Sequence, residues 1–584
     1  MKKRLSVIIL LLVVITSCFD ENKNEHKFTE IKGGMFMGGV MKLNEVEGLK
    51  SLNPISINEL NGAHIGTQLY EGLVKFNQQD LSIMPAISSH WESNENQTEW
   101  TFYIRQNIKF HNDSCFPNGV GRFLVANDIK YCFDKLCLED PNNIQFSMTF
   151  KDRVIGADET YHASKEGKVI GVSGVKVVND SMLTISLKKP FADFLNILAT
   201  PGCWIYPHEA VDSYKTDFRI HPVGTGPFYL ESINEGQSII LKKNRDYYLS
   251  DKFGNKLPYL DGVKYSFISE KKSELLEFKS GNLDMLYRLP IEFSHELMGD
   301  LDKAKEQKNE FQILNSPSLY TSYIGFNCNS ILFSKKDVRL AFNYAIDRHK
   351  IADYTIQGDG SAADYGIVPY NETFKKDGYD FSALKAYKLD VAKAKAYLKK
   401  AGYPEGKGFP KLTLEINNGG GDKNILVATV IQKMLKENLN IDVDINSMPL
   451  TEHIERVASG KVDFFALSWI ADYPAPETFL TLFYGKHLPV SSTENSYINK
   501  FRFKNSRFDS LFLASYTISD KNKRYKLLSQ AEQIVLNEAP FIPIFYQENF
   551  RLEQANVRNF PENALNYMDL TEVYLIPKEK MPKK

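Results

Sequence analysis

The chain has 584 residues, of which 43% are hydrophobic and 24% are charged, and 71 Lys and Arg residues against 72 Asp and Glu residues leave a net charge of -1. This length exceeds a single hydrophobic core and predicts several domains of roughly 100 to 200 residues each. The balanced charge gives no electrostatic case for a nucleic-acid partner, which usually requires a strongly basic protein.

The N-terminus carries the pattern of an export signal. Basic residues at 2–4 precede an apolar run at 7–15 and the sequence ITSC, which ends in Cys18. The run is shorter than the ~20 residues that a membrane-spanning helix needs, and the whole pattern is typical of a secretory signal. The ITSC ending resembles the bacterial lipobox, whose cysteine is lipid-modified. We predict a signal peptide at 1–17, lipidation of Cys18 and a polar tether at 18–25; a transmembrane helix or an unlipidated signal are the alternatives.

The remaining cysteines indicate no metal site. Their spacings match no metal-binding motif, and an odd number cannot all pair within the chain. One or two disulfides or buried free thiols are both compatible with this pattern. The five residues are Cys115, Cys132, Cys137, Cys203 and Cys328.

The N-terminal half alternates between strand and helix patterns. Apolar residues recur every second position in the strands and every third or fourth position in the helices. The predicted elements are a strand within 35–46, a helix at 63–74, a strand at 100–110, a helix at 126–136 and a hairpin at 175–187.

The clearest pattern lies between Lys411 and Trp469 and reads strand, helix, strand, helix, strand. The strands are predicted at 412–417, 441–446 and 463–469, and the helices at 425–439 and 452–458. This βαβαβ unit implies a mostly parallel sheet, and ligands of such sheets bind beyond the carboxyl ends of the strands.

The third predicted strand ends in the sequence WIAD, residues 469–472. Topology alone therefore nominates this segment as a ligand site. The structural alternative is that Trp469 belongs to the core, while Asp472 caps the next helix or forms a turn near Pro474.

Ten segments of the chain resemble, in the same order, solute-binding proteins of peptide and nickel-type ABC importers, which form solute-binding protein family 5. Oligopeptide-binding lipoproteins are the most similar members. The segments are QLYEGLVKF (68–76), PAISSHWESNENQTEWTFYIRQNIKFHN (85–112), ANDIKYCFDKL (126–136), PVGTGPFYL (222–230), KNRDYY (243–248), SGNLDM (280–285), KDVRLAFNYAIDRHKI (336–351), AKAYLKKAGY (394–403), DFFALSWIADYPAPETFL (463–480) and APFIPIFY (539–546).

The resemblance implies an α/β fold with mixed sheets, arranged as a two-lobed clamp of the periplasmic-binding-protein type II, large three-domain class. The hinge crossings would lie near Tyr320 and Phe550. Lobe 1 would comprise 26–55, 207–319 and 549–584 with an inserted domain at 56–206, and lobe 2 would comprise 320–548.

The same resemblance assigns ligand-binding roles. In peptide-binding members, the Asp that matches Asp472 pairs with the ligand's α-ammonium, and Trp469 matches an aromatic residue of the cleft. The peptide main chain would pair with exposed strand edges at Ser468 and Ile470. The facing strand of the other lobe matches Asn44, Glu45 and Val46.

The chain departs from the family pattern at two kinds of position. Ala466 and Val457 stand where some oligopeptide binders carry Arg, and Arg456 is one position away, so no cation is assigned to the ligand's carboxylate. Tyr320 and Ile470 occupy the positions of a disulfide that some members have.

The predicted function is therefore binding without catalysis. We expect a monomeric extracytoplasmic lipoprotein of a bacterial membrane, with peptide and the ABC permease subunits as partners, and neither a cofactor nor a metal. The alternatives are a nickel complex, haem or a saccharide as ligand, a surface-display role without an importer, and a secreted hydrolase. No HExxH or GxSxG motif supports a hydrolase.

Replacing Cys18 with Ser should release the protein from the membrane into the soluble fraction, because the acyl chains that form the anchor could no longer be attached. Cell fractionation and immunoblotting measure this. A mutant that stays on the membrane without another anchor would show that the lipobox prediction is wrong.

Overall fold

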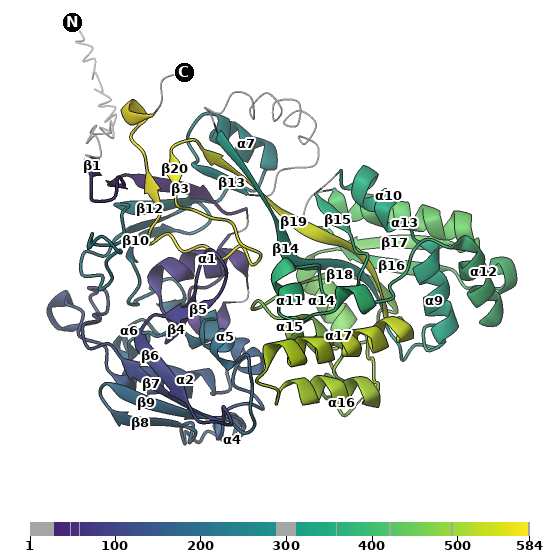
Figure 1. The fold of residues 1–584 in the computed structure, drawn as a ribbon, viewed down its shortest axis with the longest axis horizontal. Helices are drawn as coiled ribbons and strands as arrows, with labels where there is room; N and C mark the ends of the chain where they lie inside the picture. Colours follow the sequence, from purple (N-terminus) through teal and green to yellow (C-terminus); the bar gives the residue numbers. More distant parts are fainter. Residues whose placement is uncertain are drawn as a thin grey trace, which may run out of the picture.

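The computed structural model describes residues 28–581 except 47, 58, 288–310, 358, 420–421 and 492–493. The predicted signal peptide, the tether and Cys18 lie outside the described residues. Within the described part, no helix is long and apolar enough to cross a membrane. Two lobes are joined by two long paired strands, β14 (Phe311–Phe326) and β19 (Phe541–Gln554) (Figure 1).

The first lobe, as we call it, holds two four-stranded sheets of order β10-β11-β12-β3 and β6-β7-β9-β8. In the first sheet β3 runs parallel to β12. The second contains the predicted hairpin as β8 and β9. The strands are β3 (Val40–Asn44), β6 (Ser88–Ser93), β7 (Glu99–Ile104), β8 (Val175–Asn179), β9 (Met182–Ser186), β10 (Phe228–Asn234), β11 (Ser238–Lys243) and β12 (Gly262–Ser266).

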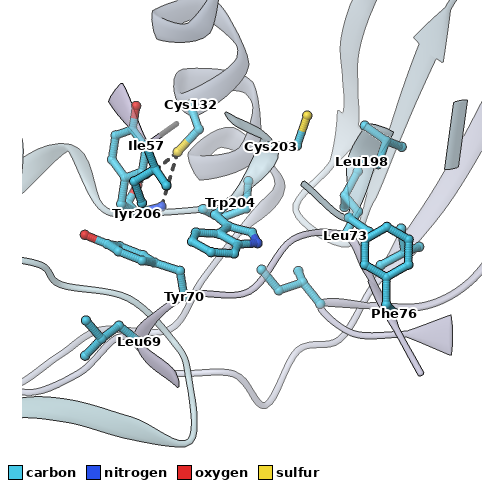
Figure 2. Packing of buried hydrophobic residues seen from close by; sticks show 14 of the residues in the cluster. Ile57, Leu69, Tyr70, Leu73, Phe76, Cys132, Leu198, Cys203, Trp204 and Tyr206 are labelled. Atoms are coloured by element: carbon cyan, nitrogen blue, oxygen red, sulfur yellow. Dashed lines mark hydrogen bonds between the residues drawn. The ribbon is translucent and has the colours of Figure 1, made fainter. Parts of the chain in front are cut away.

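Helices cover these sheets around one large core. Tyr70 and Trp204 stack with ring centroids 6.0 Å apart, and the Cys132 thiol donates to the Tyr206 carbonyl at 3.2 Å (Figure 2). The helices include α1 (Leu60–Leu69), α2 (Ala126–Leu136), α4 (Ala157–Lys165), α5 (Phe194–Leu198), α6 (His208–Tyr214) and α7 (Lys271–Lys279). The predicted bounds of the helix at 126–136 are confirmed.

The five cysteines among the described residues form no disulfide with one another. Three are buried and two are half-buried, all as free thiols. Of the two possibilities left open by their spacing, the structure has the free thiols.

Two predicted boundaries in the first lobe are wrong. The helix predicted at 63–74 ends at Leu69, because Tyr70 adopts an extended conformation (φ -121°, ψ 160°) and the chain then enters the strand β4 (Val74–Phe76). Leu73 is fully buried outside the helix, so the apolar spacing extended past the helix end. The strand predicted at 100–110 ends at Ile104 for a similar reason, since Ile108 and Phe110 are buried after a turn.

The second lobe is built on a larger mixed sheet. Its strand order is β13-β19-β14-β18-β16-β17, and β15 pairs with β19. The end strand β13 lies beside the first lobe (Figure 1), so the sheet extends across both lobes. The shorter strands are β13 (Met285–Tyr287), β15 (Gly360–Ala362), β16 (Leu412–Asn417), β17 (Val443–Met448) and β18 (Phe464–Ile470). β16 runs parallel to β17 and β18.

Helices pack on both faces of this sheet, which separates two hydrophobic clusters. They include α9 (Lys336–Ala345), α12 (Val391–Lys400), α13 (Lys423–Leu439), α14 (Leu450–Ala458), α15 (Glu477–Leu480), α16 (Ser506–Ser515) and α17 (Lys521–Glu538). The predicted βαβαβ unit is confirmed as β16, α13, β17, α14 and β18, although β17 begins two residues later than predicted.

The long strands bring the end of β18 to the junction between the lobes. β18 pairs antiparallel with β14 so that Ile470 lies opposite Tyr320. The register between β14 and β19 shifts between Pro317 and Thr321, immediately beside this pair. The end of β18 therefore lies where the two long strands lose regular pairing.

Close packing of β14 on β18 yields a stability prediction. A Cβ atom at Gly325 would lie 2.3 Å from Cε2 of Phe465, so Gly325→Ala should destabilise the second lobe by about 1–3 kcal/mol through overpacking. Urea denaturation followed by fluorescence measures the change.

The matched control is Gly48→Ala, because a Cβ there meets no atom within 4 Å. This control should leave the denaturation midpoint nearly unchanged. An equal effect of both substitutions would contradict the packing argument.

Candidate functional site

The end of β18 presents one exposed carboxylate. Asp472 is solvent-exposed, whereas its neighbours Ala471 and Tyr473 are buried. Helix α15 begins at Glu477 with Pro476 at its N-cap position and no side-chain cap. Asp472 is therefore not the N-cap of this helix, and of the two structural alternatives only the turn near Pro474 remains, since residues 472–475 form a bend.

Thr478 ties Trp469 and Asp472 together. Its hydroxyl oxygen accepts a hydrogen bond from Nε1 of Trp469 at 3.3 Å and another from the Asp472 backbone N–H at 3.3 Å. Trp469 is half-buried against the core of the second lobe. This threonine thus orders the turn that follows β18 and fixes the indole beside the carboxylate.

The Asp472 carboxyl group has an unusual pKa. Burial among protein atoms and, to a smaller extent, the charge of Glu477 raise its pKa to about 7, although Arg153 and the Thr478 hydroxyl act in the opposite direction. Water reaches the side chain, but much of the volume around the carboxyl group is filled by protein, so the charged form is poorly solvated. A cation placed here would stabilise the ionised form.

Glu477 is held behind Asp472 by two tyrosines. It is buried, accepts a hydrogen bond from the Tyr516 hydroxyl at 2.6 Å, and is bonded by the Tyr473 hydroxyl as well. Burial raises the pKa of Glu477. Each of its two oxygens is bonded within the protein, which leaves Asp472 as the carboxylate that faces solvent.

Ser468 and Ile470 lie on a strand edge with little pairing. Both residues are exposed. β18 pairs with β14 along its full length on one side, but with β16 only at Phe465 on the other. In the described part of the chain, no strand covers this second edge beyond Phe465, although Nε2 of His453 bonds to the Ala466 carbonyl at 2.9 Å. The edge at Ser468 and Ile470 is therefore the part that a ligand could reach.

The three predicted residues of the facing segment differ in availability. Asn44 is buried, and its side chain both donates to and accepts from the backbone of Ile268. Glu45 is half-buried and accepts from Nδ1 of His64 at 2.8 Å. Val46 is half-buried. These residues follow a different sheet from β18, and Asn44 has its side chain committed to the fold.

Arg456, the cation nearest to the family's Arg positions, is engaged within the second lobe. Its guanidinium forms a two-pronged ion pair with Glu415 at 2.6 and 3.0 Å. It is therefore not a free partner for an anion.

Sequence reasoning missed Thr478, Glu477 and Arg153. Thr478 and Glu477 follow Asp472 within six residues, so the turn-rich sequence ADYPAPET was a usable signal. Arg153 comes from the first lobe, and nothing in its local sequence indicated a role near Asp472.

A cavity of about 650 Å³ lies elsewhere. Its lining includes Lys411 directly before β16, Asp463 directly before β18, and Arg502. It thus lies at the opposite ends of these strands from Asp472 and contains none of the predicted site residues. Among the residues that the structure describes, no group of three or more His, Cys, Asp or Glu side chains could hold a metal ion.

Comparisons with known proteins place these features in a wider context. The family model described as bacterial extracellular solute-binding proteins, family 5 Middle, matches residues 82–487. The chain is 28% identical over 523 residues to the Dipeptide-binding protein DppE of Bacillus subtilis, covering 88% of each chain. It is 27% identical over 518 residues to the Heme-binding protein A of Haemophilus influenzae, covering 86% of this chain and 85% of that protein.

A solved structure supports the fold. The periplasmic binding protein DppA from Helicobacter pylori in complex with the peptide STSA matches with a TM-score of 0.74 at 22% identity, covering 92% of this chain and 98% of that one. The predicted two-lobed α/β fold with mixed sheets is confirmed by this likeness.

The carboxylate pair yields a titration prediction. Asp472 should titrate near pH 7, and Glu477→Gln should lower its pKa because a nearby negative charge is removed. Arg153→Gln should raise the pKa, because a stabilising positive charge is lost. NMR titration of protein labelled at aspartate carboxyl carbons measures these values, and Asp472→Asn identifies the signal. An Asp472 with an ordinary pKa in the parent protein would contradict this description.

Proposed function

The chain belongs to the bacterial extracellular solute-binding proteins of family 5, and from this membership we propose that it binds peptides between its two lobes and delivers them to an ABC-type importer. The observation that carries the proposal is the exposed carboxylate of Asp472 at the end of a partly unpaired strand. Relatives named for dipeptide and oligopeptide binding support the choice of ligand.

Asp472 would receive the α-ammonium group of the peptide. An ammonium group would supply a positively charged partner for the carboxylate. A charge-assisted hydrogen bond of this kind is stronger than a neutral one. Because the carboxyl group is half-protonated near pH 7, ligand binding would release a proton from part of the population.

The free edge of β18 would bind the peptide main chain at Ser468 and Ile470. Backbone pairing of this kind reads an extended chain and tolerates many side chains. Trp469 would contribute an apolar surface beside it. On the facing segment, Glu45 and Val46 offer accessible atoms, while Asn44 would contribute through its backbone because its side chain holds Ile268.

Closure of the two lobes would complete the site. We place the hinge at Tyr320 and Phe550, with the lobe bounds predicted from the sequence. The register shift of β14 against β19 between Pro317 and Thr321 supports this position, because irregular pairing allows the strands to bend. Contacts from both lobes would then favour the closed state when ligand is bound.

The proposed location is the outer face of a bacterial membrane, with the lipid on Cys18 as the anchor. The family consists of binding proteins rather than enzymes, and we propose no reaction for this chain. The likeness to a relative named for haem binding makes haem the second candidate ligand, so the binding assay includes a haem arm.

The test replaces Asp472 with Asn, which keeps the shape of the side chain and removes its charge. Tri-alanine should lose about 2–5 kcal/mol of binding free energy, as expected when one member of a desolvated charge pair is removed. N-acetyl-tri-alanine lacks the ammonium group, so it should bind the parent weakly and be affected much less. Isothermal titration calorimetry measures both peptides and haem.

The matched control is Asp463→Asn, which changes an exposed aspartate that precedes β18. It should leave tri-alanine affinity unchanged. Acidification below pH 7 should weaken tri-alanine binding to the parent by up to about tenfold per pH unit, because Asp472 must lose its proton to pair with the ammonium. Equal losses for both peptides, or tight binding of haem alone, would contradict the proposal.

A further inference from the structure

We propose that Asp193 of the first lobe and Arg524 of the second form a latch that holds the lobes together and thereby sets the affinity of the ligand site. The two residues are positioning residues, because they act through the closed state and not through contact with ligand. The effect on ligand affinity depends on the function proposed above, whereas the effect on closure does not.

The ion pair joins a short helix of the first lobe to a long helix of the second. Asp193 precedes α5, and Arg524 lies in the first turn of α17, which Figure 1 shows beside α5. Nη2 of Arg524 lies 3.3 Å from Oδ1 of Asp193, and the side chains are 7% and 6% exposed. Asn196 donates to the same carboxylate oxygen at 3.1 Å. Both charges are thus almost fully removed from water where the two lobes meet.

An aromatic contact continues the latch. Phe191 of the first lobe meets Tyr516 of the second edge to face, with ring centroids 5.1 Å apart and planes at 79°. The guanidinium of Arg153, which also belongs to the first lobe, lies over the Phe191 ring, 4.9 Å from the ring centroid. Tyr473 and Ala475, which follow Asp472, also pack into the core of the first lobe.

The latch reaches the candidate ligand site through Glu477. The Tyr516 hydroxyl donates to Glu477 at 2.6 Å, and the charge of Glu477 acts on Asp472. The contact surface between the lobes is therefore continuous with the turn that carries Asp472. A ligand that draws this turn toward the first lobe would tighten the same contact.

Each lobe contributes one acidic and one basic side chain to the contact between the lobes. The first lobe contributes Asp193 and Arg153, and the second contributes Arg524 and Glu477. Arg153 donates to the carbonyls of Met148 and Thr149 at 3.3 and 3.0 Å, while its Nε is buried without an acceptor. Among the described residues, no carboxylate lies within ion-pair distance of Arg153, so Glu477 acts on it only at longer range.

Burial of the Asp193–Arg524 pair explains how it can act reversibly. Desolvation offsets part of the attraction in a buried ion pair, so the intact pair favours the closed state only modestly and the lobes can still separate. Loss of one partner is different, because the remaining charge is unpaired in the closed state but solvated in the open state. Removing either partner should therefore shift the population toward the open state without unfolding either lobe.

The experiment compares Asp193→Asn, Arg524→Gln and the double variant in the full chain without ligand. Small-angle X-ray scattering should show a larger radius of gyration for each single variant than for the parent. The double variant should lie closer to the parent than the two single effects predict, because no lone charge is left to bury. Tri-alanine should bind each single variant at least about fivefold more weakly, the lower end of typical coupling between sites.

The matched control is Arg456→Gln, which breaks the Glu415 ion pair inside the second lobe and should leave the scattering profile unchanged. Single variants that scatter like the parent would overturn the latch. Absence of tri-alanine binding to the parent would overturn the proposed function instead, and the ligand-free scattering would still decide whether the latch exists.

Discussion

The pairing of β14 with β19 is the constraint on which the rest of the structure depends. These strands pair along residues 311–317 and again along 321–325, with a register shift between the two stretches. β18 pairs with β14, while β13 and β15 pair with β19. Because strands from both lobes are bonded to the same two-stranded ribbon, its geometry sets how the lobes face each other. The candidate site lies where that geometry becomes irregular.

Electrostatics mark the position of Asp472. Its side chain is exposed to water, yet its pKa is raised to about 7. The cause of the raised pKa is local: burial among protein atoms contributes most, the charge of Glu477 adds to it, and Arg153 is not close enough to form an ion pair. About half of the Asp472 carboxyl groups would therefore be protonated at pH 7, and the ammonium group of the proposed peptide ligand would shift this equilibrium toward the ionised form. The same Glu477 belongs to the contact between the lobes, so ligand charge and closure involve shared residues.

Sequence patterns predicted local structure well where one periodicity dominates. The helix at 126–136 and the strand at 412–417 have the predicted bounds, and the βαβαβ order located Asp472 beyond a strand end. Prediction was wrong at 63–74, because the buried Leu73 continues the apolar spacing of a helix that has already ended. Contacts between distant segments left no local signal. Arg153 and Asp193 reach the second lobe only through the tertiary fold. The side chain of Asn44 bonds to the backbone of Ile268, which lies 224 residues later in the chain.

A crystal structure of the protein with bound tri-alanine tests the central claim most directly. The account predicts the peptide between the lobes, with its ammonium nitrogen within hydrogen-bond distance of the Asp472 carboxylate and its main chain beside Ser468 and Ile470. A peptide bound in the cavity lined by Lys411 and Arg502, or bound between the lobes with its ammonium group away from Asp472, would contradict it.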